Sequence, residues 1–309
     1  MTGPELTAFL YGAVGKWAMY GLAIFVVGLV SFRFVSLARV AENLKWAPAT
    51  GAKYDRRLAR AGIIATGILI WVHLWRLFAQ TYSIFGIDES VSLANVNLVL
   101  LEMAWGTGWL LQAIGATFAF VAFVLARYAP GFGWWLTIAG GFIVAASLPF
   151  TGHAAAEATN AGLAIGSQTA HVLAAGLWLG TLSVTWVLGI TKDEPTETKH
   201  EMLKGLIGAF LPVALIGVII VTVSGLVTAI SLFEHLNQLW TTTYGRWLLL
   251  KLALVGGVVA LGGYNRIRVV PKLGNSEGTQ AFRKITVIEL GVALLVLVVT
   301  AVFTGLGIE

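Results

Sequence analysis

Eight long apolar stretches constrain the fold of this chain more than any other feature. Each exceeds the ~20 residues that an α-helix needs to cross a bilayer core of ~30 Å. Within such a core the backbone must satisfy its own hydrogen bonds, so helices or closed barrels are required, and runs of this length exclude a barrel. The chain is therefore predicted to be an all-α polytopic membrane protein. Its eight-helix transmembrane bundle would use residues 6–38, 58–83, 95–127, 133–157, 161–190, 204–232, 242–270 and 281–307.

Composition supports this class and excludes several kinds of metal site. Hydrophobic residues make up 58% of the chain and charged residues 11%, a balance outside that of soluble globular proteins. The absence of cysteine excludes disulfides, thiolate metal sites, iron–sulfur clusters and covalently attached c-type haem. Because the connecting segments are short, residues 1–309 are expected to form a single transmembrane domain. The first stretch is too long for a signal peptide and has no basic segment before it, so it is expected to remain as the first helix.

Basic residues predict the orientation of the bundle. Sixteen of the twenty Lys and Arg residues fall in segments that an eight-helix count places on one side. Basic residues in short loops stay in the cytoplasm, so both termini are expected to be periplasmic, in a bacterial inner membrane. The net charge of +5 then reflects topology. Lipid is the expected surrounding, and no nucleic-acid partner is expected because the loops lack the exposed aromatic residues of such a surface.

Polar residues inside the apolar stretches are the candidates for function, because they are costly in lipid. At a rise of ~1.5 Å per residue, His73, Glu102 and His171 should share a layer ~10 to 15 Å below the periplasmic surface. His153 is expected nearer the outer end of its helix, and His235 at the outer end of another. Imidazole and carboxylate groups suit copper(II). The pattern predicts a periplasm-facing metal site made by His153, His171, His73, Glu102 and His235, although each histidine could instead be a hydrogen-bonded packing residue.

Closely spaced glycines predict tight helix packing. Gly176 and Gly180 are four residues apart, and glycine pairs occur at 256–257 and 262–263. Small residues at such spacings let membrane helices approach closely. We therefore expect these glycines to lie at helix–helix contacts.

Five sequence runs resemble a known family. They are TGHAAA at 151–156, TAHVLAAGLWLGTLS at 169–183, TTTYGRWLLLKLALV at 241–255, GGYNRIRVVPKL at 262–273 and VIELGVALLVLVVTAV at 287–302. Residues 140–305, which carry them, resemble the CopD copper-resistance family. The resemblance implies eight membrane helices and movement of copper between periplasm and cytoplasm, often beside a separate periplasmic copper carrier of the CopC type.

The resemblance also implies roles for individual residues. It marks His153 and His171 as an outward-facing polar pair. It further marks a signature on the seventh helix, formed by Tyr244, Arg246 and Lys251, and an inner cluster formed by Asn265, Arg266 and Glu289. Glu289 is expected to neutralise Arg266 or Arg268, and a cation exit site is the alternative role for this carboxylate.

Two other functions remain open from the sequence. Lys16, Arg76, Arg246 and Lys251 break the positive-inside pattern, and in the outer half they would repel a copper ion. They would suit a b-type haem whose propionates pair with Arg76 and Lys251 and whose iron is held by two histidines. The histidines would come from His73, His171 and His153, in a membrane electron-transfer subunit.

The third alternative is a scaffold subunit of a membrane complex that binds no metal. There, Glu102 would pair with Lys251 or Lys16. No arrangement typical of an enzyme active site occurs in the chain, so catalysis is not expected. Copper binding and transport across the inner membrane, contributing to copper resistance or homeostasis, is the function that the sequence favours.

Overall fold

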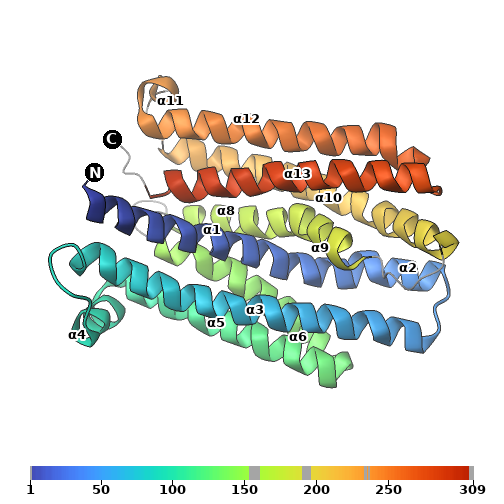
Figure 1. The fold of residues 1–309 in the computed structure, drawn as a ribbon, viewed down its shortest axis with the longest axis horizontal. Coiled ribbons are helices and arrows are strands. Elements are labelled where there is room, and N and C mark those ends of the chain that lie inside the picture. The colour runs from blue at the N-terminus through green and yellow to red at the C-terminus, as the bar shows by residue number, and fades with distance from the viewer. Residues whose placement is uncertain (1, 153–160, 190–195, 233–234, 236, 306–309) are drawn as a thin grey trace.

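The computed structural model describes residues 2–152, 161–189, 196–232, 235 and 237–305, and throughout these residues the chain forms helices joined by short connections. Figure 1 shows the helices aligned along one long axis. Within the described residues, eight helices are long and apolar enough to cross a membrane, which confirms the predicted number. These spans are Gly3–Asn43, Pro48–Ile84, Ala104–Tyr128, Pro130–Thr151, Ala161–Leu188, Thr198–Ile230, Thr243–Lys272 and Ser276–Phe303.

Several spans combine an α-helix with a π or 3-10 segment. The N-terminal half contains α1 (Gly3–Ser31), η1 (Phe32–Leu37), α2 (Ala38–Asn43), α3 (Pro48–Phe85), α4 (Leu93–Asn97), η2 (Leu98–Glu102), α5 (Ala104–Tyr128), α6 (Pro130–Ser147) and η3 (Leu148–Thr151). The C-terminal half contains α8 (Ala161–Ala175), η4 (Gly176–Gly180), α9 (Thr181–Leu188), α10 (Thr196–Leu232), α11 (Gln238–Thr241), α12 (Thr243–Tyr264), η5 (Asn265–Val269), η6 (Val270–Lys272) and α13 (Ser276–Phe303).

Helix starts follow local capping chemistry. Ser92, Thr242 and Asn275 each accept a hydrogen bond from a backbone N–H of the helix that they precede. Pro48 and Pro130 stand at the first positions of α3 and α6, where the missing N–H of proline removes no helix hydrogen bond. Helices α3, α4, α6, α12 and α13 therefore begin where the sequence supplies a cap or proline.

The two ends of the bundle differ in charge. The start of α1 and the end of α13 lie at one end in Figure 1, which we call the termini end, together with α4 and α11. The opposite end holds the start of α3 and the α12–α13 connection. We call it the basic end. Of the sixteen Lys and Arg residues that were predicted to be cytoplasmic, those that the structure describes lie in this half of the bundle.

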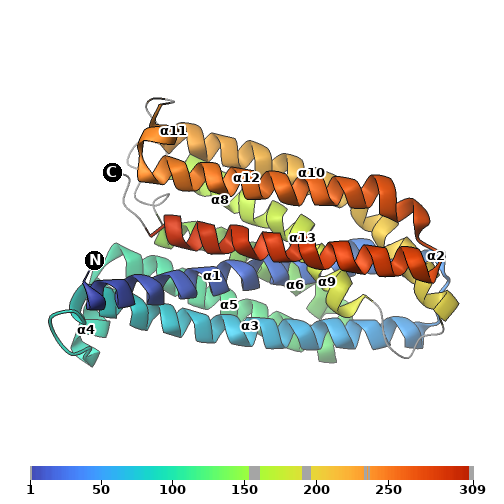
Figure 2. The ribbon, with the colours of Figure 1, turned by 45° about the horizontal axis from the view of Figure 1, so that its top comes forward.

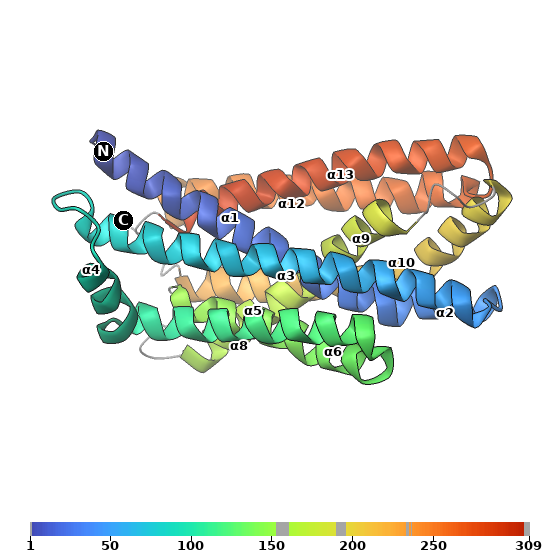
Figure 3. The ribbon, with the colours of Figure 1, turned by 60° about the horizontal axis from the view of Figure 1, so that its bottom comes forward.

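Helix α1 connects the two halves of the bundle. It packs against α3 and α6 on one side and against α8, η4, α9 and α13 on the other. Figure 1 places α12 at one edge, with α13 and α1 between it and α3, and Figure 2 shows the same order from α12 to α3. Figure 3 shows α1 running obliquely between α13 and α3. α1 is therefore the common packing partner of both halves.

A close helix contact between α1 and η4 requires glycine. A Cβ atom added to Gly28 would lie 2.1 Å from the backbone carbon of Gly180, and one on Gly180 would lie 2.1 Å from the Ile24 carbonyl oxygen. A Cβ on Gly176 would lie 2.4 Å from Cγ1 of Val27. The packing role predicted for Gly176 and Gly180 is confirmed.

The glycines of α12 behave differently. A Cβ on Gly256, Gly257 or Gly263 would meet no atom within 4 Å, and only Gly262 faces a protein neighbour. Helix α12 packs against α13, η5 and α11, and these three glycines lie off those contacts. The expected packing role is wrong for them.

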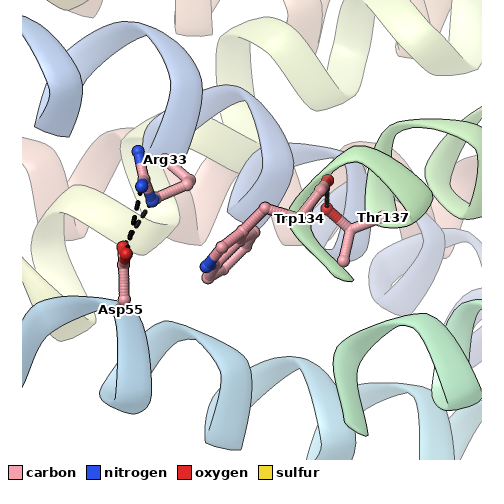
Figure 4. Close-up of polar contacts among 4 residues, drawn as sticks. All are labelled: Arg33, Asp55, Trp134 and Thr137. Carbon is pink, nitrogen blue, oxygen red and sulfur yellow. Dashed lines mark hydrogen bonds and ion pairs between the residues drawn. The ribbon is translucent and has the colours of Figure 1, made fainter. Parts of the chain in front are cut away.

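An ion pair ties α1 to α3 near the basic end. Arg33 of η1 binds the Asp55 carboxylate through Nη2, 3.0 Å from Oδ2, and through Nε. The guanidinium also lies 5.4 Å from the ring centroid of Trp134 on α6. Figure 4 shows the pair beside Trp134, whose backbone carbonyl accepts a hydrogen bond from the Thr137 hydroxyl. Three helices thus meet around one cation.

Substituting Gly28 by Ala tests the α1–η4 contact. The added methyl group would clash with the Gly180 backbone, which cannot move as a flexible side chain does. We expect the change to cost about 1 to 3 kcal/mol of stability, the usual penalty of overpacking. The measurement is the midpoint of thermal unfolding of the detergent-purified protein.

Gly12→Ala is the matched control on the same helix, because a Cβ there meets nothing within 4 Å. It should leave the midpoint unchanged or raise it, since alanine favours helix more than glycine does. Equal midpoints for the two variants would show that α1 and η4 are not in this contact.

Candidate functional site

Three groups of polar side chains among the described residues are candidate sites. The His171 seam (His171, Ser167, Ser224 and Thr228) lies between α8 and α10, and the Arg76 cluster (Arg76, Met19, Gln112 and Thr151) lies among α1, α3, α5 and η3. The Glu289 cavity is lined by α10, α12 and α13 together with η4, α9, η5 and η6. Their positions follow from helices that place a polar residue on an inward face.

The His171 seam joins α8 to α10 through side-chain hydroxyls. Nδ1 of His171 lies 3.0 Å from Oγ of Ser224. One helical turn earlier on α8, the Ser167 hydroxyl donates to the Ser224 carbonyl oxygen at 3.0 Å and lies 3.4 Å from Oγ1 of Thr228. Gly225 leaves space for the imidazole, because a Cβ there would be 3.5 Å from Cε1 of His171.

The hydrogen bonds of Ser224 determine which nitrogen of His171 carries the proton. Oγ of Ser224 lies 2.6 Å from the Ile220 carbonyl oxygen, which can only accept. A hydroxyl has one hydrogen, so the hydrogen shared with His171 comes from Nδ1. The other ring nitrogen, Nε2, then carries a lone pair. This is the form of histidine that binds metals, with a hydrogen bond at Nδ1 that fixes the tautomer.

The Arg76 cluster encloses a buried guanidinium. Nη1 of Arg76 donates to Oε1 of Gln112 at 2.6 Å and contacts the Met19 sulfur at 2.8 Å, and Nη2 donates to Oγ1 of Thr151 at 3.0 Å. The Gln112 amide nitrogen donates in turn to Thr151 and to the backbone carbonyls of residues 147 and 148. The cluster connects α1, α3, α5 and η3. The Met19 sulfur is also engaged there.

The role predicted for Arg76 beside a haem stays a prediction. Its guanidinium is buried and bound to Gln112, Thr151 and Met19. Pairing with a propionate would require these bonds to be exchanged inside the protein, which is costly.

His73 lies one turn before Arg76 on α3 and is 2% exposed. Its backbone carbonyl accepts a hydrogen bond from Nε1 of Trp109 at 2.7 Å. The ring nitrogen Nδ1 is buried and has no hydrogen-bond partner. Buried polar atoms are normally paired, so a buried nitrogen of this kind needs an explanation.

Glu102 lies elsewhere than predicted. It was expected inside a continuous helix over 95–127, at the depth of His73. Instead the chain is extended at Met103, with φ −99° and ψ 141°, so Glu102 ends the separate segment η2 and is exposed. Gly106 permits this fold, because a Cβ there would lie 2.2 Å from the Leu100 carbonyl oxygen. The shared depth of Glu102 is therefore wrong.

Of the two remaining candidate histidines, the structure describes only His235. His235 is exposed at the termini end, and its backbone N–H donates to Oε1 of Gln238. His153 lies outside the described residues. Within the part of the chain that the structure describes, no three His, Asp or Glu side chains are grouped so as to hold a metal ion.

The other basic residues of the outer half bind neutral groups. Nζ of Lys16 donates to the Thr304 carbonyl oxygen at 2.9 Å, and Nζ of Lys251 lies 5.6 Å from the ring centroid of Phe303. Nε of Arg246 donates to the Trp240 carbonyl oxygen at 3.1 Å. The predicted pairing of Lys16 or Lys251 with Glu102 is wrong for the described structure, since no ion pair of Glu102 forms there.

The inner cluster is also paired differently from the prediction. Nδ2 of Asn265 donates to Oε2 of Glu289 at 3.2 Å, whereas Arg266 and Arg268 are exposed. Glu289 forms no ion pair with either arginine in the described structure, so the expected neutralisation is wrong. Tyr244, from the helix-seven signature, is buried and packs on Phe303, with ring centroids 4.8 Å apart.

Sequence reasoning missed Ser224, Ser167 and Thr151 as members of these groups. Serine and threonine are common in membrane helices and usually bond to the carbonyl one turn earlier. Their spacing therefore carries no distinguishing signal. An interhelical contact from such a residue becomes visible only when the pairing of helices is known.

Comparisons with known proteins identify the family. The family described as Copper resistance protein D-like, N-terminal domain, matches residues 8–163, and Copper resistance protein D matches residues 204–303. No solved structure matches the chain.

Three curated relatives are similar over most of the chain. Copper transport protein CutJ of Bacillus subtilis is 25% identical over 95% of this chain and 52% of its own length. Copper resistance protein D of Pseudomonas syringae is 25% identical over 91% of this chain and 92% of its own. Inner membrane protein YebZ of Escherichia coli is 29% identical over 69% of this chain and 72% of its own.

The chain spans about half the length of the Bacillus relative. The names of the relatives refer to copper resistance, copper transport and the inner membrane, in agreement with the copper-related prediction. The family matches together cover both halves of the bundle. The chain is thus a multi-pass protein of the inner membrane and belongs to the copper resistance protein D family.

Proposed function

We propose that this protein binds copper at the termini end of the bundle and moves it across the inner membrane, contributing to copper resistance or homeostasis. The observation that carries the proposal is the geometry of His171. Ser224 holds its Nδ1–H and leaves Nε2 as a lone-pair donor inside the membrane domain. Copper(II) accepts imidazole nitrogen readily.

His153 is the proposed partner of His171 in receiving copper, on the strength of the family motif at 151–156. Glu102 and His235, both exposed at the termini end, are proposed as outer contacts of the arriving ion. Their positions need no change in the bundle core. A copper ion would meet the exposed carboxylate and imidazole first, and the histidine pair deeper in the bundle would then bind it.

His73 is the proposed next ligand. Its buried Nδ1 has no hydrogen-bond partner, and a metal ion would satisfy it. Leu69, one turn before His73, and Val172, next to His171, belong to one apolar cluster with Met19 and Ala23 of α1. His73 and His171 thus lie beside the same part of α1, from opposite sides. This supports a similar depth in the membrane for the two histidines, although they do not touch each other.

The proposed orientation places the termini end in the periplasm and the basic end in the cytoplasm. The separation of charge between the two ends supports it. Copper would then arrive from the periplasm, carried by a separate protein of the CopC type.

Replacing His171 by Ala should abolish copper binding by the purified protein and lower copper accumulation in expressing cells, because the ligand is lost. Ser224→Ala should weaken copper affinity by about 10- to 100-fold, the usual cost of losing a hydrogen bond that orients a metal-binding histidine. Equilibrium dialysis with copper(II) measures both effects.

His200→Ala is the control, since His200 lies at the start of α10 near the basic end. It should bind copper as the unchanged protein does. If His171→Ala also bound copper with unchanged affinity and stoichiometry, the proposed site would be wrong.

Single cysteines test the orientation. The chain contains no cysteine, so each substitution gives an unambiguous label. Ser90→Cys, in the exposed α3–α4 connection, should react with a membrane-impermeant maleimide added to spheroplasts. Ser276→Cys, exposed at the start of α13, should react only after the membrane is permeabilised. The reverse pattern would place the termini in the cytoplasm.

A further inference from the structure

A cavity of about 160 Å³ lies in the basic half of the C-terminal helices. Its walls come from η4, α9, α10, α12, α13, η5 and η6, and are almost wholly apolar, with Trp178, Phe210, Val259 and Phe282 among them. Glu289 on α13 also lines it. Burying an ionised carboxyl group among apolar side chains is costly unless the group is paired or neutralised.

Glu289 has a single hydrogen bond in the described structure. Its side chain is 2% exposed, and its Oε2 accepts from Nδ2 of Asn265 at 3.2 Å. Oδ1 of Asn265, buried in the same place, has no partner. The pair therefore holds more acceptor atoms than donor hydrogens, and it lacks at least one donor.

The charged groups around the cavity do not supply that donor. Among the lining residues, only Arg266 and Glu289 carry charge, since the contributions of η4, α9, α10, α12 and η6 are uncharged. Arg266 is exposed and forms no ion pair with Glu289 in the described part of the chain. An ionised Glu289 would be a buried charge without a close counter-ion, which is expensive.

The oxygen atoms present do not suit a metal ion. Calcium takes six to eight oxygen ligands, and magnesium requires a near-octahedral set. Here the two carboxylate oxygens and the Asn265 carbonyl oxygen face apolar walls. A proton needs one acceptor and removes the buried charge. It also provides the O–H donor that the unpartnered Asn265 oxygen lacks.

Space at the second carboxylate oxygen is consistent with this role. A Cβ added to Gly262 of α12 would lie 3.1 Å from Oε1 of Glu289. The missing side chain leaves Oε1 room to carry a hydrogen. Asn265 stands at the junction of α12 and η5, where its amide nitrogen holds Oε2 of Glu289 by donation.

We propose that Glu289 is a proton-binding site of this membrane protein, with Asn265 as the residue that positions its carboxyl group. Glu289 lies thirteen residues after the first residue of α13, about 20 Å along the helix axis. Its proton thus resides within the apolar part of the bundle. Uptake and release there would change the internal charge by one unit, and the site does not depend on copper binding.

Infrared spectroscopy of the full chain in a detergent without ester groups, at neutral pH and without added metal, tests the proposal. A protonated carboxylic acid absorbs above the amide I band, where ionised carboxylates do not. The chain should show such a band, and Glu289→Gln should lose it. Glu102→Gln, which removes an exposed carboxylate, should keep it.

Asn265→Leu tests the positioning role and provides a second route if Glu289→Gln fails to fold. Loss of the amide partner should move the carbonyl band to higher wavenumber without removing it. A structural effect alone would lower thermal stability and leave the band in place. Glu289→Asp should restore a band in this region.

Two results would overturn the proposal. One is a folded protein, shown by its amide I band, with no acid carbonyl band at neutral or mildly acidic pH. The other is a carboxylate signal at Glu289 that shifts when sodium is replaced by choline, which would indicate a bound cation instead. Because no copper is present, neither result bears on the copper site at His171.

Discussion

The contact between α1 and η4 determines how the two halves of the bundle fit together. At Gly28 and Gly180 the backbones of α1 and η4 lie so close that the Cβ atom of any other amino acid would overlap the opposite backbone. In lipid, helices gain little from burying apolar side chains, so close van der Waals packing between small residues carries much of the association. The Arg76 cluster lies on one side of α1 and the His171 seam on the other. The relative placement of the candidate ligands therefore depends on two glycines.

Four basic side chains in the termini half of the bundle interact with neutral groups. Lys16 and Arg246 bind backbone carbonyls, Lys251 lies over an aromatic ring, and Arg76 binds an amide, a hydroxyl and a thioether. Each cation is held without a carboxylate. Among the described residues, this pattern leaves Glu102 without an ion pair to these bases. The ion-pair alternative, which required Glu102 to bind Lys16 or Lys251, therefore gains no support.

Hydropathy and charge were sufficient to predict the helical class and the number of spans. They could not predict the break at Met103, because residues 95–127 remain apolar on both sides of it and the turn is made by backbone geometry. Nor could they predict that Asn265, rather than an arginine, binds Glu289. Both outcomes depend on how helices rotate about their axes, and this rotation is set by contacts such as Gly28 with Gly180 rather than by local sequence. Gly256 and Gly257 illustrate the same limit, since their spacing resembles that of packing glycines while their helix face meets no neighbour.

Helix α10 contributes residues to both the His171 seam and the Glu289 cavity. Ser224 on α10 orients His171, and residues 207–218 of the same helix contribute wall positions to the Glu289 cavity. Pro212 stands within that cavity-lining segment. A proline inside a helix removes one backbone hydrogen bond and weakens the rod at that point. Two sites connected by a stiff helix would respond to each other as one rigid body. Pro212 divides the wall residues of α10 into Ile207, Phe210 and Leu211 before it and Ala214, Leu215 and Val218 after it. The segment before Pro212 can therefore adjust to the protonation of Glu289 while the segment that carries Ser224 keeps its hydrogen bond to His171.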